Sequence, residues 1–496
     1  MTTIPPQDTD EVELERLLAQ AAAAAGPWGD ILPSARAEAL RAVADALDAS
    51  SAELVPLADR ESHLGAARLT GELARTTFQL RLLAREIASG ELFHAIVDRA
   101  DQAWPAGPRP DLRRVHRPLG PVVVFAASNF PFAFSTAGGD TASALAAGCP
   151  VLLKAHPGHL QLTARTGDVV AAALAGSGAP VGTFVVFYGD EAGRAAVQDP
   201  RIAAGAFTGS LQGGRSLFDL AVSRPTPIPF YAEMGSINPV FVTQGALIAR
   251  REQILSGYVE SFTLGAGQFC TKPGLLVVPE SAGVGEDLAA VLAGRSGTTM
   301  LNDRIAHGHR RVRHRLANHP AVEVLAIGSE PADAAPDGPP APALLRVSAA
   351  GLVRYADELL EECFGPTSIV VTYTSWSEVL DLARALAGQL TATVHAEETD
   401  PGVGELLRVL QDVAGRILWN GWPTGVSVTW AMHHGGPYPA TSSPMYTSVG
   451  TSAIDRFLRP LTFQSVPEAL LPPALRDANP LGVPRREGAT AAELGL

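Results

Sequence analysis

The sequence predicts an α/β protein with two doubly wound layers, each a largely parallel sheet covered by helices. Three observations predict this class. Residues 10–90 have helical periodicity, short continuous apolar runs alternate with helical stretches from Pro121 onward, and the same alternation resumes at Pro239. Continuous apolar runs are typical of parallel strands that are buried on both faces. With 496 residues, the chain is also too long for a single hydrophobic core.

The N-terminal region is expected to form amphipathic helices over residues 11–25, 34–47, 51–64 and 69–87. Asp48 and Ser50 are candidate caps between the second and third of them. Residues 104–120 are rich in proline and arginine, which indicates an extended hairpin or a connecting arm.

The first α/β unit is expected to have strands at 122–126, 151–154, 184–187, 204–207 and 228–232, separated by helices at 137–147, 160–174, 192–197 and 213–221. Such a layer is a plausible mononucleotide-binding platform. The second unit is expected to have strands at 239–242, 275–278, 368–371, 391–395 and 416–419, with helices at 248–264, 283–293 and 303–317. Residues 331–342 are predicted to be an exposed loop. Residues 457–464 are predicted to be an edge strand, and the tail beyond Pro467 is expected to wrap a surface or fray.

Composition argues against several classes of function. A net charge of −13 disfavours nucleic-acid binding, which needs a basic face. The N-terminus lacks a signal-peptide pattern, and no uncharged apolar run reaches the length of a membrane span. Three unevenly spaced cysteines form neither a disulfide framework nor a metal-binding pattern, so a reducing cytoplasm and no metal are expected.

Cys270 is the candidate nucleophile. It lies in the segment Gly-Ala-Gly-Gln-Phe-Cys-Thr at 265–271, just after an apolar helical run. Glycine-rich backbone lets a ligand approach closely. The alternative is a buried structural cysteine, which is the commonest role of a free thiol. We interpret Cys149 and Cys363 as structural for that reason.

Two other polar side chains follow buried strands, where open α/β sheets bind ligands. Asn129 has an amide donor that could stabilise an oxyanion, or it could simply form a turn. Glu233 could be a general base with a pKa raised by burial, or a solvated carboxylate. Lys154, one of only two lysines, also ends a strand, although such a lysine is often only a surface residue.

A strand, a tight turn and a helix start follow one another at 204–215, where small residues could bring backbone N–H groups to a phosphate. The segment lacks the Gly-x-Gly-x-x-Gly fingerprint, so a standard Rossmann site is not indicated, and a plain turn is an equal alternative.

The order of these motifs over roughly residues 15–465 resembles the NAD(P)-dependent aldehyde dehydrogenase superfamily. The segments around Cys270, Glu233 and Asn129 resemble its nucleophile, general-base and oxyanion motifs. The resemblance implies cofactor contacts at Lys154, at Phe207, Thr208, Gly209 and Ser210, and at Glu362 and Phe364 of a Glu-x-Phe-Gly-Pro motif.

Longer motifs resemble one branch, which holds α-ketoglutaric semialdehyde (2,5-dioxopentanoate) dehydrogenases and NADP-preferring fatty-aldehyde dehydrogenases. They begin at Phe125, Ala137, Asn420, Met432 and Arg456. The family fold implies a cofactor domain at 1–103 and 119–235 and a catalytic domain at 236–445. An oligomerisation arm and tail would be formed by 104–118 and 446–496, in a homodimer or homotetramer.

The resemblance implies oxidation of an aldehyde to an acid through a Cys270 thiohemiacetal and thioester, with α-ketoglutaric semialdehyde giving 2-oxoglutarate. A fatty or general aldehyde dehydrogenase is the alternative, and a cofactor-independent cysteine esterase is a more remote one. Glu233 argues against a CoA-acylating enzyme, which typically lacks this base.

The cofactor is expected to be NADP or NAD, with NADP favoured. Many NAD-preferring members have a glutamate three residues after the lysine, whereas this chain has Pro157. Arg194, at a helix start after Gly189 and Gly193, could supply positive charge to a 2′-phosphate.

Overall fold

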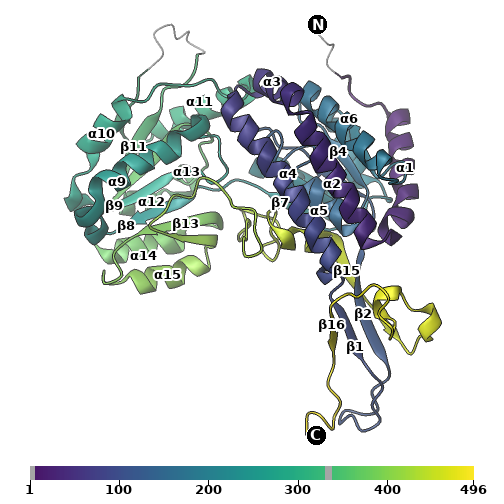
Figure 1. Ribbon diagram of the computed structural model, residues 1–496. Coiled ribbons are helices and arrows are strands. Elements are labelled where there is room, and N and C mark those ends of the chain that lie inside the picture. The colour runs from purple at the N-terminus through teal and green to yellow at the C-terminus, as the bar shows by residue number, and fades with distance from the viewer. Residues whose placement is uncertain (1–5, 330–337, 496) are drawn as a thin grey trace.

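The computed structural model describes residues 6–329 and 338–495. Its described strands form three sheets, with the orders β5-β4-β3-β6-β7, β10-β11-β12-β9-β8-β13-β14 and β15-β2-β1-β16. The α/β class predicted from the sequence is confirmed. Figure 1 shows α1–α6 gathered around the sheet that contains β4, and α9–α15 around the sheet that contains β8 and β13.

The five-stranded sheet is parallel throughout. Its strands are β3 Val122–Phe125, β4 Val151–Lys154, β5 Phe184–Phe187, β6 Ala204–Thr208 and β7 Phe230–Glu233. Its helices are α1 Glu11–Asp30, α2 Pro33–Ala49, α3 Ser51–Ser62, α4 Ala66–Ser89, α5 Gly139–Ala147, α6 Leu160–Gly176, α7 Asp190–Gln198 and α8 Leu211–Val222.

Alternating side chains of β3 separate two cores. Val122 and Val124 pack into a cluster with α2–α6, whereas Val123 and Phe125 pack with α1, α7 and α8. Apolar residues at successive positions therefore bury both faces of the sheet, which is the reason the continuous runs identified its strands.

The seven-stranded sheet is parallel except for the pairing of β10 with β11. Its strands are β8 Pro239–Val242, β9 Leu275–Pro279, β10 Glu323–Ile327, β11 Ala343–Ser348, β12 Thr367–Tyr373, β13 Gln389–His395 and β14 Ala414–Trp419. Its helices are α9 Gln244–Thr263, α10 Gly285–Ala293, α11 Asp303–Ala317, α12 Ala349–Arg354, α13 Ala356–Leu359, α14 Trp376–Ala385 and α15 Val403–Gln411.

The four-stranded sheet projects from the α/β units as an arm (Figure 1). It contains β1 Ala95–Asp98, β2 Leu112–Pro118, β15 Leu458–Gln464 and β16 Arg485–Glu487. Strands β1 and β2 form an antiparallel pair, but only β2 lies within the expected hairpin or arm at 104–120, and β1 before it was not predicted. Strand β15 is the predicted edge strand. The tail returns along β1 through β16 and so wraps a surface.

Several expectations were incomplete or wrong. Strands β10 and β11 and helices α12–α15 were not anticipated. Most of the predicted loop at 331–342 lies outside the described residues. Ser50 is a cap as predicted, but of the end of α2: its hydroxyl donates to Ala46 O at 2.8 Å, and its side chain accepts nothing from α3. The side chain of Asp48, the other predicted cap, accepts from Arg81. Among the described helices, none is long and apolar enough to cross a membrane.

A buried ion pair ties the start of the C-terminal segment to α5. Arg456 is 3% exposed, and its Nη1 donates to Asp140 Oδ1 at 2.7 Å. Its Nη2 donates to Ser143 Oγ at 3.1 Å. The pair fixes the chain that leads from the α/β units into β15.

We predict that Arg456→Met lowers the midpoint of thermal inactivation by several degrees. Removing one partner leaves the Asp140 carboxylate buried without its cation, which costs about 3–5 kcal/mol. Arg459→Met, at an exposed position three residues later, is the matched control. Equal midpoints for the two variants would contradict the assigned role of the pair.

Candidate active site

The polar side chains predicted after β4, β6 and β7 lie along one edge of the five-stranded sheet. Lys154 ends β4, Thr208 ends β6 and Glu233 ends β7. Thr208 and Glu233 are paired residues on adjacent strands, and Gly209 N donates to Glu233 O at 3.0 Å. Parallel strands place their carboxyl ends together, so this is the edge at which a ligand is expected.

Cys270 reaches this edge from the other α/β unit through a sharply turned segment. Gly265, Ala266 and Gly267 have φ of 55°, 56° and 65°, a left-handed conformation that re-aims the chain after α9. A Cβ atom at Gly267 would lie 2.3 Å from Gly365 O, so only glycine fits there. This contact joins residues 265–271, here called the nucleophile segment after the predicted role of Cys270, to the loop at 362–366.

Further hydrogen bonds hold the nucleophile segment. Asn238 Nδ2 donates to the carbonyl oxygens of Cys270 and Lys272 at 2.8 and 3.0 Å. Gln268 Oε1 accepts from Leu301 N at 2.9 Å. The buried Lys272 donates to Cys363 O and Thr367 O, both at 2.8 Å, so the second lysine of the chain has a structural role. Cys149 and Cys363 are free and buried.

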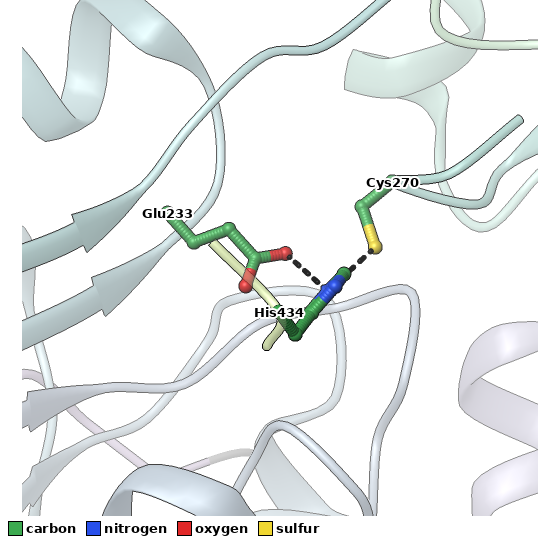
Figure 2. A group of neighbouring side chains, drawn as sticks. All are labelled: Glu233, Cys270 and His434. Carbon is green, nitrogen blue, oxygen red and sulfur yellow. Dashed lines mark hydrogen bonds and ion pairs between the residues drawn. The ribbon is translucent and has the colours of Figure 1, made fainter. Parts of the chain in front are cut away.

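Cys270 meets two ionisable partners (Figure 2). His434 Nε2 lies 3.5 Å from Cys270 Sγ and 3.1 Å from Glu233 Oε1. Ser448 Oγ donates to Glu233 Oε2 at 2.7 Å, which fixes the carboxylate. The sulfur, nitrogen and oxygen atoms all lie within 4.8 Å of one another. A proton can therefore pass between these groups without a large movement of the chain.

The same environment acts on Cys270 and Glu233 in opposite directions. Burial, followed by the negative charge of Glu233, raises the pKa of the Cys270 thiol well above its ordinary value, while Arg416 lowers it. Burial alone would raise the pKa of Glu233, but the charge and hydrogen bond of His434 hold it below its ordinary value. The resting state is therefore a thiol beside a carboxylate, and thiolate formation needs an adjacent base.

Asn129 lies beside this group. Its Nδ2 donates to Gln268 O at 3.2 Å, two residues before Cys270, and leaves a second amide N–H. Phe130 packs edge-on against Phe269, with their ring centroids 5.3 Å apart. The strand-end amide predicted as an oxyanion donor is thus brought to the nucleophile segment.

The predicted cofactor residues surround the same strand edge. Lys154 Nζ donates to Asp190 Oδ1 at 2.5 Å. Gly193 lies against Lys154 and Phe125, and Gly189, with φ of 95°, lies against Asp8. Arg194 Nη1 donates to Ser216 Oγ at 3.2 Å, so its guanidinium is tied to α8.

The turn after β6 and the Glu362 loop complete this edge. Gly209 lies against the ring of Phe207, and Ser210 caps α8 by accepting from Gly213 N at 3.2 Å. A Cβ atom at Gly235 would lie 2.8 Å from Glu362 Oε2, so that carboxylate rests on the Glu233 segment. Burial raises the pKa of Glu362 to about 7, although Lys272 opposes the shift. Phe364 is half-buried.

These residues fit a nicotinamide dinucleotide. The buried hydroxyl oxygen of Thr208 has no hydrogen-bond partner among the described residues, and it lies beside Glu233. Glycines 189, 193 and 209 leave backbone where a Cβ atom would collide with a neighbour. Lys154 and Glu362 supply a cation and an anion on the two sides of the strand edge.

His434 was not predicted as a site residue, although it lies in the motif that begins at Met432. His434 is buried, its backbone N donates to Thr447 Oγ1 at 2.8 Å, and its carbonyl accepts from Ser448 N. It is 164 residues from Cys270 in the chain, so only the fold shows that the two side chains meet. The adjacent histidines in the sequence were the available signal.

Known proteins resemble this chain in sequence over most of its length. The aldehyde dehydrogenase family model matches residues 2–304. The chain is 47% identical over 462 residues to alpha-ketoglutaric semialdehyde dehydrogenase 2 of Azospirillum brasilense, covering 92% of this chain and 87% of that protein. It is 43% identical to alpha-ketoglutaric semialdehyde dehydrogenase of Acinetobacter baylyi, covering 91% and 86%.

A solved structure shares the fold. The chain superposes on a 3,6-anhydro-L-galactose dehydrogenase in complex with NADP with a TM-score of 0.77. The two chains are 21% identical, and the match covers 92% of each.

We predict that His434→Asn slows alkylation of Cys270 by iodoacetamide at pH 7 by at least about tenfold, because only the thiolate reacts and its nearest proton acceptor is lost. The modified cysteine is identified by peptide mass spectrometry. His433→Asn, which changes the neighbouring half-buried histidine, is the control and should react like the wild type. An unchanged rate in His434→Asn would exclude the imidazole as the base.

Proposed function

Because the chain belongs to the aldehyde dehydrogenase family, we propose that it oxidises α-ketoglutaric semialdehyde to 2-oxoglutarate with NADP⁺ or NAD⁺ as acceptor. Membership confirms the resemblance on which the sequence interpretation was based, together with aldehyde oxidation as the reaction. The proposed substrate is supported by two relatives above 40% identity that are named for it. The observation that carries the chemistry is the meeting of Cys270, His434 and Glu233.

The reaction begins with activation of the thiol. Cys270 Sγ gives its proton to His434 Nε2, which then lies as an imidazolium 3.1 Å from the Glu233 carboxylate. The ionised carboxylate stabilises the imidazolium, and Ser448 holds the carboxylate in place. Arg416 adds positive potential that favours the thiolate.

The thiolate attacks the aldehyde carbon and forms a thiohemiacetal. The Asn129 amide and the Cys270 backbone N–H donate to the oxygen that becomes negative. When bound, the nicotinamide ring supplies the hydride acceptor, and the carbon is left as a thioester of Cys270.

Hydrolysis completes the cycle. Ser448 Oγ donates a hydrogen bond to Glu233 Oε2. Oε1 is therefore the oxygen that accepts a proton from water as the water attacks the thioester. The C–S bond breaks, the acid leaves, and the sulfur departs as thiolate. In total, aldehyde, water and the oxidised cofactor give acid, reduced cofactor and a proton.

In this proposal Lys154 and Glu362 bind the two cofactor riboses, Phe364 packs near the nicotinamide ribose, and Ser210 marks the start of α8 beside the nicotinamide. NADP⁺ is favoured for two reasons. Pro157 stands where a glutamate would repel a 2′-phosphate, and Arg194 on α7 supplies positive charge on the adenosine side of the cofactor.

Asp190 opposes this preference. It pairs with Lys154, and this ion pair must break before Lys154 can bind a phosphate.

We also propose the division into a cofactor domain, a catalytic domain and an oligomerisation arm, and a homodimer or homotetramer in a reducing cytoplasm. Strand β15 supports the assembly, because it ends its sheet and its outer edge is free to pair with another copy. The three free cysteines are compatible with the compartment.

A general or fatty aldehyde is the second candidate substrate. An apolar group formed by Phe134, with Phe130, Val426 and Val428 packed against it, lies beside the ring of His434 and would suit an alkyl chain. Initial rates with α-ketoglutaric semialdehyde, succinic semialdehyde, hexanal and decanal, each with both cofactors, distinguish the two candidates.

We predict that Cys270→Ser abolishes reduction of NADP⁺ by aldehydes and that Glu233→Gln preserves one burst of reduced cofactor. In Glu233→Gln the acyl-enzyme forms but hydrolyses slowly, so the steady-state rate falls by about 10²-fold or more. Stopped-flow absorbance of the reduced nicotinamide cofactor measures both the burst and the steady state. Turnover in Cys270→Ser would contradict the nucleophile, and a normal steady state in Glu233→Gln would remove that base.

We predict that NAD⁺ binding weakens by up to about tenfold between pH 8 and pH 6, because the pKa of Glu362 is raised to about 7 and only its ionised form accepts from both ribose hydroxyls. Tryptophan fluorescence quenching measures the affinity. Glu362→Gln should show no such dependence. Glu361→Gln, which alters the exposed neighbour paired with Arg315, should keep it. A pH dependence that survives in Glu362→Gln belongs to another group.

A further inference from the structure

We propose that Arg75 binds the carboxylate of the substrate and selects aldehydes that carry one. The inference deepens the proposed function and rests on it for the aldehyde chemistry. It assigns the anionic end of the substrate to a guanidinium on α4 that lies near the ring of Phe134, the same ring that contacts His434.

Three arginines near the active site lack a carboxylate partner. Within the described parts of the chain, Arg68, Arg75 and Arg416 form no ion pair, and each has a buried nitrogen without a hydrogen-bond partner: Nη1 of Arg68, Nη1 of Arg75 and Nε of Arg416. A desolvated guanidinium without an ion pair is unfavourable, so each of the three is a candidate for binding an anionic ligand. The three differ in how strongly the protein already holds them.

Arg68 contacts both the Asn129 loop and the segment that contains Cys270. Its Nη2 donates to Asn129 O at 2.7 Å, and its guanidinium lies over the rings of Phe130 and Phe269 at 5.1 and 4.6 Å. A Cβ atom at Gly265 would lie 2.5 Å from its Nη1, so that nitrogen is pressed against the nucleophile segment. Arg68 therefore joins the Asn129 loop to this segment and has no open side for a ligand.

Arg416 is also held firmly. Its Nη2 donates to Pro423 O at 2.7 Å and its Nη1 to Gly425 O at 3.2 Å. Both terminal nitrogens thus have protein acceptors, and the unpartnered atom is the internal Nε. Its charge acts on Cys270, which fits a role in stabilising the thiolate.

Arg75 is held weakly and has a free terminal nitrogen. Its Nε and Nη2 share one acceptor, Val426 O, at the long distance of 3.4 Å each. Three of its five N–H groups remain, two on Nη1 and one on Nη2, which is the end-on pair that binds a carboxylate through both oxygens. Glu72, three residues earlier, has one oxygen committed to the backbone N–H groups of Phe132 and Ala133.

The position of Arg75 suits the chain of the substrate. Its guanidinium lies 5.5 Å from the ring centroid of Phe134, and that ring lies 6.0 Å from the His434 ring beside Cys270. Burial lowers the pKa of Arg75, and the negative charge of Glu72, followed by those of Cys270 and Glu233, opposes that shift, so Arg75 is close to the reaction centre. The Phe134 ring neighbours both the guanidinium and the imidazole beside Cys270, and an apolar contact there suits the two methylene groups between the aldehyde and the 2-oxo acid of α-ketoglutaric semialdehyde.

A purely structural role for Arg75, as a tie to Val426, makes a different prediction. It would affect every aldehyde alike, whereas a carboxylate anchor affects only charged ones. The experiment therefore compares α-ketoglutaric semialdehyde and succinic semialdehyde with pentanal, a neutral aldehyde, in the wild type, Arg75→Met, Arg75→Lys and Arg85→Met. Arg85 is exposed on the same helix and serves as the matched control.

For Arg75→Met we expect kcat/KM to fall about 30-fold for the preferred charged aldehyde, mostly through KM, and less than about threefold for pentanal. Arg75→Lys should recover part of the loss. Arg85→Met should show no loss with any of the aldehydes. Competitive inhibition by 2-oxoglutarate gives an independent measure of carboxylate binding: its inhibition constant should rise about as much in Arg75→Met, and Arg75→Lys provides this test if the Met variant does not fold.

Equal losses for charged and neutral aldehydes, or no loss for either, would overturn the anchor even if the wild type oxidises α-ketoglutaric semialdehyde. A wild type that prefers succinic semialdehyde and loses it selectively in Arg75→Met would overturn the proposed substrate and support the anchor. A wild type with no preference for charged aldehydes would overturn both.

Discussion

The contact of one imidazole nitrogen with both a thiol and a carboxylate is the constraint on which the site depends. Cys270 comes from a segment after α9, Glu233 from the end of β7, and His434 from the long segment that returns toward the arm. Cys270 and Glu233 come from different α/β units, so the site exists only where the two units meet. The left-handed turn at 265–267 and the Arg456–Asp140 pair are the local features that keep these segments in place.

Electrostatics explains why a third group is needed. A buried thiol beside a carboxylate resists ionisation, and the same carboxylate must stay ionised to activate water. In the proposed mechanism the imidazole separates these demands, because it takes the proton of the thiol while its positive charge favours the carboxylate anion. The arginines around the site have related but distinct roles: Arg416 offsets the negative charge near Cys270, and Arg75 is left with donors for an anion from outside the protein.

Much of the fold was predictable from the sequence because apolar side chains cover both faces of its central strands. The bounds of β4, β5 and β8 were predicted to the residue. Strand β10 was missed although residues 324–327 form a short apolar run; it is an antiparallel edge strand whose residues are exposed or half-buried, so it lacks the two buried faces of the other strands. Helix α14 was also missed, although Ser375 caps it and Glu378 follows three residues later, which is a recognisable capping signal. The site residues that follow strands could be predicted from the order of their motifs along the chain. His434 and Arg75 could not, because their roles depend on contacts between segments far apart in the sequence.

The central claim is that Cys270 carries the substrate as a covalent thioester that Glu233 helps to hydrolyse. Intact-protein and peptide mass spectrometry of Glu233→Gln, quenched in acid after mixing with NADP⁺ and α-ketoglutaric semialdehyde, tests it directly. The account predicts an added acyl group on the peptide that contains Cys270, and no such group when the cofactor is left out. An unmodified Cys270, or an acyl group on Cys149 or Cys363 instead, would contradict it.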